Sequence, residues 1–357
     1  MSKLKVGLVG IGRGTAYGKV FAEHPQTEVV ALCDFNEEKL AKSVEEFHLP
    51  DHMGFLDFNK FIEADMDVVV LGTPIPNHEE EVIASLESGK HVLSEVTVAN
   101  TISGCQNIYN AVKKAKTKYM MAENCNYMDF TIQWKKYVDQ GRLGAIHYAE
   151  ADYIHEIQSR IIDAETGAEQ WRTQRAPIHY CSHSLGPLLY LMDDYIIKTT
   201  ASGNRADIIK NVGVGAIDLQ VALFETKKGA IIKVARSSVT FRNPPLCHYS
   251  LYGTKGFIES GRGNYDNIGQ RFFHDVDSGP VQIVCSSSDP DASPEMRLGG
   301  HGTSEYFLAR DFIDSIIHDT NPPIDIVKAL DMSVPGLVAH EAAMQGNIWL
   351  DVPNFWH

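Results

Sequence analysis

The sequence predicts two domains: an α/β domain built on a doubly wound parallel sheet, then an α+β domain with a mixed or antiparallel sheet. Up to about Glu123, short apolar strands alternate with helical segments, an order typical of parallel sheets. Beyond residue 140 the segments are β-rich, with turn signals such as Lys227-Lys228-Gly229 between them. With 357 residues there is enough chain for two cores, and we expect domains at 1–124 and 125–357.

The first domain begins with an apolar strand over Lys5 to Val9, which leads into Gly10, Gly12 and Gly14. Next we expect, in order, a helix over Ala16 to Glu23, a strand over Glu28 to Leu32, a helix over Glu37 to Phe47, a strand over Asp67 to Leu71, a helix over Pro76 to Ser88, a strand over His91 to Ser94, a helix over Ile102 to Ala115 and a strand over Tyr119 to Ala122. Asp67 to Leu71 is almost continuously apolar, which is typical of a buried parallel strand.

The glycine-rich turn predicts a dinucleotide site, because glycines let the backbone approach a pyrophosphate and the following helix N-terminus favours its charge. Asp34, 24 residues after Gly10, is placed to accept hydrogen bonds from a ribose 2′-hydroxyl. A 2′-phosphate would be repelled there, and no basic residue follows before Lys39, so NAD is expected rather than NADP. The strict motif has Gly or Ala where Thr15 stands, with Gly14 one place early. The strand–turn–helix–strand–Asp order therefore carries the prediction of a Rossmann domain.

In the second domain, periodicity predicts mostly strands. These are expected over Ile146 to Ile154, Ala216 to Glu225, Ala230 to Val239, Cys247 to Tyr252 and Phe257 to Ser260, with helices over Ser182 to Met192, Ser304 to Ile317 and Ile326 to Met344. This order indicates a sheet with helices on one side.

The composition narrows the class of protein. A net charge of −14 argues against nucleic acid or an anionic membrane as a partner, since both favour a basic face. No apolar run approaches the roughly 20 residues of a membrane span, and the chain enters its first strand too early for a signal peptide. The six cysteines show no C-x-x-C pair, which suits a reducing compartment. We expect a cytoplasmic protein.

Three further motifs accompany the glycine turn: Thr73-Pro74-x-Pro76-Asn77-His78, Gly89-Lys90-His91-Val92-Leu93-x-Glu95 and Ala122-Glu123-Asn124. With them the whole chain resembles the Gfo/Idh/MocA family of sugar and inositol oxidoreductases. Ordinary members of that family follow the glutamate with Lys-Pro, and the lysine helps hold the nicotinamide ribose and the substrate hydroxyl. Here Val96 and Thr97 occupy those two places.

This departure is similar to an NAD-dependent branch, glycoside hydrolase family 109, which tends to carry Glu-Val there. Other pieces that resemble this branch are Tyr153-Ile154-His155, Trp171-Arg172, Tyr180-x-x-His183-x-Leu185-Gly186-Pro187 and Gly299-Gly300-His301-Gly302. The resemblance implies NAD as cofactor, a carbohydrate ligand, and a homodimer or homotetramer formed through the open face of the second sheet.

The cofactor contacts that motif and resemblance together imply are Gly10, Gly12, Arg13, Gly14, Asp34, Thr73, Pro74, Asn77, His78, Glu95 and Asn124. Glu95 ends a parallel strand beside the expected nicotinamide position, so it is also a candidate catalytic residue. Asn77 has helix capping as its simple alternative.

His183 is the leading candidate for proton transfer, because family members commonly carry a histidine there, preceded four places earlier by an aspartate that is His179 here. A metal bound by these two histidines would need a third ligand, and no metal-ligand spacing is present, so we expect none. Tyr180 could bring a phenol to the same site, or simply pack. His301 is a further candidate catalytic residue, because it lies among glycines that permit close approach to a ligand, with a surface loop as the alternative. Tyr153, Trp171, Arg172 and His179 are candidate substrate contacts, although Trp171 and Arg172 could equally anchor a loop.

Three functions fit these residues. In the first, bound NAD⁺ oxidises a secondary hydroxyl of a sugar, typically at carbon 3, and the ketone leaves. In the second, the ketone makes the carbon-2 hydrogen acidic, a base such as Tyr180 or His183 removes it, the anomeric group is expelled, water adds and the sugar is reduced again by the retained cofactor. The net reaction is then glycoside hydrolysis without a pair of catalytic carboxylates. The third is a non-catalytic NAD-binding sensor.

Overall fold

The computed structural model describes residues 2–204, 217–263, 268–284 and 293–357. Ala216, at the start of one predicted strand, and Cys285, one of the six cysteines, lie outside this part of the chain. Contacts divide the chain into two units. The first contains the residues up to Tyr127 and a later stretch that ends at Leu330, and the second begins at Met128 and resumes at Asp331.

The sequence predicts a single boundary between residues 124 and 125. In the structure, a later stretch of the chain, which ends at Leu330, also belongs to the first unit. Helix α8 (Ser304–Ile317) packs against α1 (Ile11–Glu23) and against the short η3 helix (Asn124–Tyr127). Buried side chains on α8, such as Leu308 and Phe312, explain why this segment belongs with the N-terminal core.

In the first unit, the sheet has the order β3-β2-β1-β4-β5-β6, and every neighbouring pair is parallel. Its strands are β1 (Leu4–Val9), β2 (Thr27–Cys33), β3 (Gly54–Phe55), β4 (Val68–Leu71), β5 (His91–Ser94) and β6 (Tyr119–Met121). The other helices are α2 (Glu37–Glu46), α3 (Phe58–Phe61), α4 (His78–Glu87) and α5 (Ile102–Lys114). The doubly wound sheet predicted from the sequence is confirmed, and β3 and α3 are additions to it.

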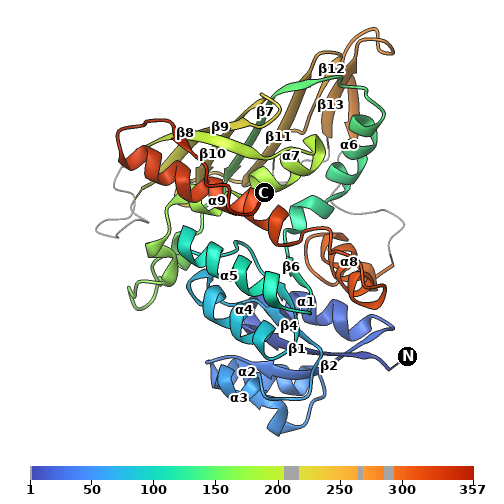
Figure 1. Ribbon diagram of the computed structural model, residues 1–357, viewed down its shortest axis with the longest axis vertical. Helices are drawn as coiled ribbons and strands as arrows, with labels where there is room; N and C mark the ends of the chain where they lie inside the picture. Colours follow the sequence, from blue (N-terminus) through green and yellow to red (C-terminus); the bar gives the residue numbers. More distant parts are fainter. Residues whose placement is uncertain (1, 205–216, 264–267, 285–292) are drawn as a thin grey trace. The chain divides into compact units, whose positions relative to one another are not determined.

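Strand order reverses between β1 and β4. Helices therefore cover opposite faces of the sheet: α4 and α5 lie together on one side, and α1 and α8 on the other (Figure 1). Each of the four β4 residues is buried, as expected of a strand covered on both faces. Ligands of such sheets bind beyond the carboxyl ends of the strands at this reversal, which is where β1 leads into Gly10.

A mixed nine-stranded sheet forms the second unit, in the order β14-β13-β12-β11-β7-β10-β9-β8-β15. Among the strands that the structure describes, only β7 and β10 run parallel, and the remaining neighbouring pairs are antiparallel. The strands are β7 (Ile146–Ile154), β8 (Ile196–Asn204), β9 (Leu219–Thr226), β10 (Ile231–Ser237), β11 (Leu246–Gly253), β12 (Gly256–Glu259), β13 (Ile268–Phe273), β14 (Val281–Val284) and β15 (Leu350–Asp351). The helices are α6 (Asp129–Asp139), α7 (Ser182–Met192) and α9 (Ile326–Met344), whose first residues belong to the first unit. The predicted α+β domain is confirmed.

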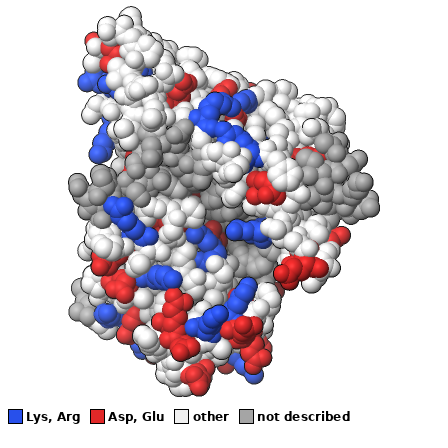
Figure 2. Space-filling view, turned by 180° about the vertical axis from the view of Figure 1, so that it is seen from behind, with Lys and Arg blue, Asp and Glu red and all other residues white. Residues whose placement is uncertain are grey.

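Charged side chains of both signs are interspersed over the face seen in Figure 2, many of them adjacent. One exposed pair of the first unit joins Lys19 and Glu46, whose Nζ and Oε1 lie 3.0 Å apart. None of the helices in the described part of the chain is long and apolar enough to cross a lipid bilayer.

Candidate functional site

The loop between β1 and α1 is shaped for close approach of a ligand to backbone. Gly10 has φ +77°, and a Cβ there would lie 2.6 Å from the carbonyl carbon and oxygen of Gly72, so only glycine fits. At Gly12 a Cβ would meet no heavy atom within 4 Å, because the loop is open there. Helix α1 starts at Ile11 with no acidic residue in its first turn, so its dipole is available to an anion. These features fit a pyrophosphate.

Asp34 lies directly after β2 and is 9% exposed. Its Oδ2 accepts the backbone N–H of Ile11 at 2.8 Å, and its Oδ1 accepts the N–H of Asn36 at 2.8 Å. These two bonds fix the carboxylate beside the glycine loop and leave further lone pairs for hydroxyl donors. The position and chemistry of Asp34 thus fit a ribose diol.

Glu81, on α4, organises the loop that follows β4. Its carboxylate accepts hydrogen bonds from the Thr73 hydroxyl and, at 3.3 Å, from Asn77 Nδ2. Burial raises the pKa of Glu81, against the effect of these two donors. The capping alternative for Asn77 is not observed, since its side chain makes no cap hydrogen bond to α4. Pro74 precedes the short helix Ile75–Asn77 at the tip of the loop.

His78, which is fully buried, also contacts the loop that contains Thr73 and Asn77. Its ring nitrogens lie 2.7 Å from the Thr97 carbonyl and 3.1 Å from the Thr73 carbonyl. His78 therefore joins two loops at the carboxyl edge of the sheet. Asn124, another predicted cofactor contact, is 3% exposed at the start of η3.

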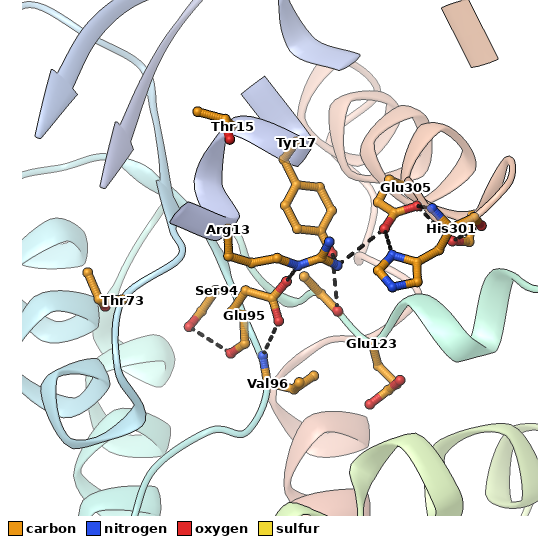
Figure 3. A network of polar contacts seen from close by, with 12 residues as sticks. Arg13, Thr15, Tyr17, Thr73, Ser94, Glu95, Val96, Glu123, His301 and Glu305 are labelled. Carbon is orange, nitrogen blue, oxygen red and sulfur yellow. Dashed lines mark hydrogen bonds and ion pairs between the residues drawn. The ribbon is translucent and has the colours of Figure 1, made fainter. Parts of the chain in front are cut away.

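Four charged or titratable side chains form a chain of polar contacts in the first unit (Figure 3). Arg13 Nε donates to Glu95 Oε1 at 2.6 Å, and Arg13 Nη2 donates to Glu305 Oε1 at 3.2 Å. The same Glu305 oxygen lies 2.5 Å from His301 Nδ1. The structure thus brings together Arg13, Glu95 and His301, three predicted site residues that are far apart in the sequence.

Glu305 was missed by the sequence reasoning, although it stands four residues after His301 at the start of α8. Its side chain is fully buried. Burial opposes its charge, but hydrogen bonding and attraction from His301 and Arg13 hold the pKa of Glu305 below its usual range. A Cβ at Gly299 would lie 2.3 Å from Glu305 Cβ. Gly299, in the loop that carries His301, therefore allows the backbone to lie close to the Glu305 side chain.

A cluster of aromatic and basic side chains in the second unit is built on two paired strands. Arg236 on β10 pairs with Tyr153 on β7 in parallel register, so both side chains lie on the same face of the sheet. The guanidinium carbon of Arg236 lies 4.2 Å from the Tyr153 ring centroid and 4.8 Å from that of Tyr180. Tyr180 comes from the short helix Pro177–Tyr180 that precedes α7.

His183, in the first turn of α7, joins these rings. Its imidazole centroid lies 5.0 Å from Tyr180 and 5.8 Å from Tyr153. The Tyr153 hydroxyl is 3.1 Å from His155 Nδ1. Burial, followed by the charge of Arg236, lowers the pKa of His155, so its neutral form, able to accept a proton, predominates at neutral pH. The second unit therefore gathers two phenols and two imidazoles.

Three predicted substrate contacts have other neighbours. The His179 ring packs edge-on against His340 at 4.7 Å, and burial, His340 and Arg175 lower the pKa of His179 to about 3. Arg172 lies over the ring of Trp171 at 4.4 Å, so one face of the indole is already covered by its neighbour. The contacts of Trp171 and Arg172 fit the anchoring alternative for these two residues, and His179 is packed against another ring.

A glycine turn at a helix N-terminus, with an acid after the second strand of a doubly wound sheet, defines the class of NAD-binding Rossmann proteins. Residues 4–123 match the family model described as the oxidoreductase family with an NAD-binding Rossmann fold, and residues 131–259 match the GFO/IDH/MocA C-terminal domain. The chain belongs to the Gfo/Idh/MocA family of NAD-binding oxidoreductases.

One curated relative is a glycosyl hydrolase family 109 protein of Shewanella pealeana, 25% identical over 398 residues that span 99% of this chain and 86% of the relative. Among solved structures, an oxidoreductase domain protein from Kribbella flavida has a TM-score of 0.85 at 18% identity, over 99% of this chain and 100% of that one. A levoglucosan dehydrogenase in complex with NADH and L-sorbose has a TM-score of 0.84 at 22% identity, with the same coverage. Both solved structures share the fold of this chain.

Proposed function

We propose that this protein is an NAD-dependent oxidoreductase that acts on a secondary hydroxyl of a sugar or sugar derivative, with carbon 3 as the expected position. The observation that carries the proposal is the group of two phenols and two imidazoles in the second unit, Tyr153, His155, Tyr180 and His183. Oxidation of an alcohol needs a base for the hydroxyl proton, and neutral imidazole is the side chain suited to this at neutral pH.

The first unit would hold the cofactor. The open backbone at Gly12 and the N-terminus of α1 fit the pyrophosphate, and Asp34 fits the ribose diol. NAD⁺, when bound, supplies the hydride acceptor for the carbon that carries the hydroxyl. Arg13 and Val96 hold the Glu95 carboxylate from both sides, through Nε at 2.6 Å and the backbone N–H at 3.0 Å, so Glu95 acts as an anchoring group. Of the predicted catalytic residues in this unit, His301 keeps the more exposed side chain, at 42%.

A second candidate is net glycoside hydrolysis with NAD retained through turnover. The relatives named glycosyl hydrolase family 109 and the valine at position 96 favour it. In this reaction the sugar is oxidised at carbon 3, loses the proton at carbon 2 and the anomeric group, takes up water and is reduced again. His183 or Tyr180 would take the carbon-2 proton, and no pair of catalytic carboxylates is needed.

One experiment separates the candidates. Protein purified without added nucleotide is mixed with chromogenic glycosides, and aglycone release is followed together with nicotinamide absorbance. Steady release with a small, saturating NADH signal supports the hydrolase. NADH that accumulates with free sugars after addition of NAD⁺, without release, supports the dehydrogenase. No redox change with any sugar would instead support an NAD-binding sensor and refute both.

His183→Asn tests the assignment of proton transfer. It should lower turnover by about 10²–10⁴-fold, the usual contribution of a general acid or base. NAD affinity should stay unchanged, because the predicted cofactor contacts lie in the first unit. Unchanged turnover would remove His183 from the mechanism, and Tyr180→Phe is the parallel test for the phenol.

The homodimer or homotetramer expected from the sequence also remains a proposal. The face of the nine-stranded sheet that carries Val221 and Leu223 on β9 supports it, since these apolar side chains are 36% and 37% exposed. Light scattering on wild type and Leu223→Glu tests whether this face joins copies of the chain. The expected cytoplasmic location is tested by cell fractionation.

A further inference from the structure

Two buried arginines of the second unit have no acidic partner among the described residues. Arg236 is 2% exposed and Arg175 is 6% exposed. Arg236 Nε and Nη1 and Arg175 Nε are buried and have no hydrogen-bond partner in the part of the chain that the structure describes. Within the described ranges, no carboxylate forms an ion pair with either arginine or with Arg172. Buried guanidinium groups ordinarily have such partners, so this arrangement indicates a site for an anionic ligand.

The neighbours of these arginines are aromatic. Arg175 lies 4.2 Å from the Tyr180 ring centroid and 5.6 Å from that of Trp171, and Arg236 shares Tyr180 at 4.8 Å. Aromatic faces attract cations, but they leave the planar N–H donors of a guanidinium unused. The rings therefore hold the two guanidinium groups in place but do not provide hydrogen-bond acceptors for their buried nitrogens.

Mutual repulsion makes the lack of an anion costly. Burial, then the positive charge of Arg236, lowers the pKa of Arg175 to about 9, with Tyr180 acting in the opposite direction and Arg172 adding to the repulsion. Arg175 is still charged at neutral pH, so like charges gather in the interior. An oxyanion bound to these groups would offset both the burial and the repulsion.

The position of these arginines connects them to substrate. Arg236 contacts Tyr153, and both arginines contact Tyr180, the two phenols of the proposed proton-transfer group. Arg172 and Arg175 also line a small cavity whose other walls are mostly apolar. A charged substituent of the substrate could thus be bound beside the reacting hydroxyls.

We propose that Arg175 and Arg236 bind an oxyanion carried by the substrate, so that the sugar is an acidic one. This inference rests on the proposed action on carbohydrates and names the class of carbohydrate. A planar guanidinium fork matches a carboxylate or a phosphoryl or sulfuryl group bidentately. A uronic acid, a sugar phosphate and a sugar sulfate share this chemistry.

Binding to NAD-saturated protein, measured by calorimetry, tests the proposal without requiring turnover. The probes are matched pairs that differ in the charged group: glucose with glucuronate, galactose with galacturonate and mannose with mannuronate. Glucose 6-phosphate and glucose 6-sulfate distinguish the anion source. At least one acidic probe should bind more than about tenfold tighter than its neutral counterpart, as expected for a charge pair formed in a buried site. If no acidic probe binds tighter than its neutral counterpart to wild type, the proposal is wrong.

The variants Arg175→Met and Arg236→Gln should remove that preference, measured in each variant as the ratio of acidic-sugar to neutral-sugar affinity. The control is Arg262→Gln, which removes an equal charge from a side chain that is 63% exposed in the same unit, and it should keep the preference. Thermal unfolding of Arg175→Met separates a packing role, which predicts lower stability, from anion binding, which predicts stability equal to wild type or higher. A preference that survives in both arginine variants overturns the proposal. If the variants do not fold, the wild-type pairs alone decide.

The outcomes also separate this inference from the proposed function. Acidic sugars that bind in an arginine-dependent way without any change in nicotinamide absorbance leave the anion site standing and contradict the redox proposal. Oxidation of neutral sugars, with no preference for acidic ones, supports the redox proposal and contradicts the anion site.

Discussion

Alanine at Gly10 and at Gly12 should have opposite effects, although the two glycines are only two residues apart, one before α1 and one in its first turn. At Gly10, alanine must adopt φ near +77°, which costs about 1–2 kcal/mol for an L-residue. Its Cβ would also meet Gly72 backbone at 2.6 Å, and an overpacked site of this kind costs a further 1–3 kcal/mol or so. Gly10→Ala should therefore lower the unfolding free energy of the first unit by about 2–5 kcal/mol.

At Gly12 the added methyl group meets nothing within 4 Å, and a glycine in a helix gains up to about 1 kcal/mol from replacement by alanine. The stability of Gly12→Ala should equal or slightly exceed that of wild type. Its methyl group would nevertheless fill the space where we place the pyrophosphate. A steric cost of about 1–3 kcal/mol corresponds to NAD binding that is roughly 5- to 150-fold weaker.

Urea unfolding and NAD⁺ calorimetry on the three proteins measure both effects. Unchanged NAD affinity in Gly12→Ala would refute the placement of the pyrophosphate at this loop. Unchanged stability in Gly10→Ala would refute the reasoning from the left-handed conformation and the Gly72 contact.

Three other perturbations have defined outcomes. Asp34→Arg should weaken NADH binding about tenfold and strengthen NADPH binding, measured by fluorescence titration, and an unaltered ratio would contradict the ribose assignment. The pKa of His179 is about 3 in the fold against 6.5 in the unfolded chain, so the unfolded chain binds a proton that the native state excludes, and stability falls as the pH drops from 6.5 towards 3. The loss between pH 7 and pH 5 should be about 2 kcal/mol smaller in His179→Asn than in wild type, and equal losses in urea unfolding would show that His179 titrates normally. Glu305→Ala should lower the unfolding free energy by about 3 kcal/mol because Arg13 and His301 lose a buried partner, and a loss below about 1 kcal/mol would make that ion pair unimportant.

Strongly patterned elements were predictable from the sequence. Strands β5 and β7 and helices α7, α8 and α9 occur at the predicted residues. The missed elements have weak patterns for physical reasons. Strand β14 lies at a sheet edge, where Val284 is 67% exposed and burial imposes no alternation. Helix α6 buries only Phe130, Thr131 and Trp134, and β8 is rich in small and polar residues.

The two polar clusters could be foreseen only in part. Glycine spacing and Asp34 are local signals, and they led to the dinucleotide site. The pair of Arg13 with Glu305 joins residues 292 apart, and it depends on the return of α8 to the first unit. Arg236 did carry a signal, since it occupies a buried position in the alternating strand β10, after Ile232 and Val234. Its pairing with Tyr153 depends on the single parallel contact of an otherwise antiparallel sheet, which no local pattern specifies.

Valine stands after Glu95 where ordinary family members have a lysine, and this affects which residues would take the substrate proton. Val96 is 3% exposed and offers no titratable group. Glu95 is engaged by Arg13 and by the Val96 backbone, and Arg13 is shared with Glu305, so both carboxylates are committed to holding one cation. Removal of a proton from substrate then depends on imidazole and phenol groups. This is why replacement of His183 or Tyr180 should affect both candidate reactions, whereas a variant at Glu95 should first change cofactor affinity and the order of the Arg13 network.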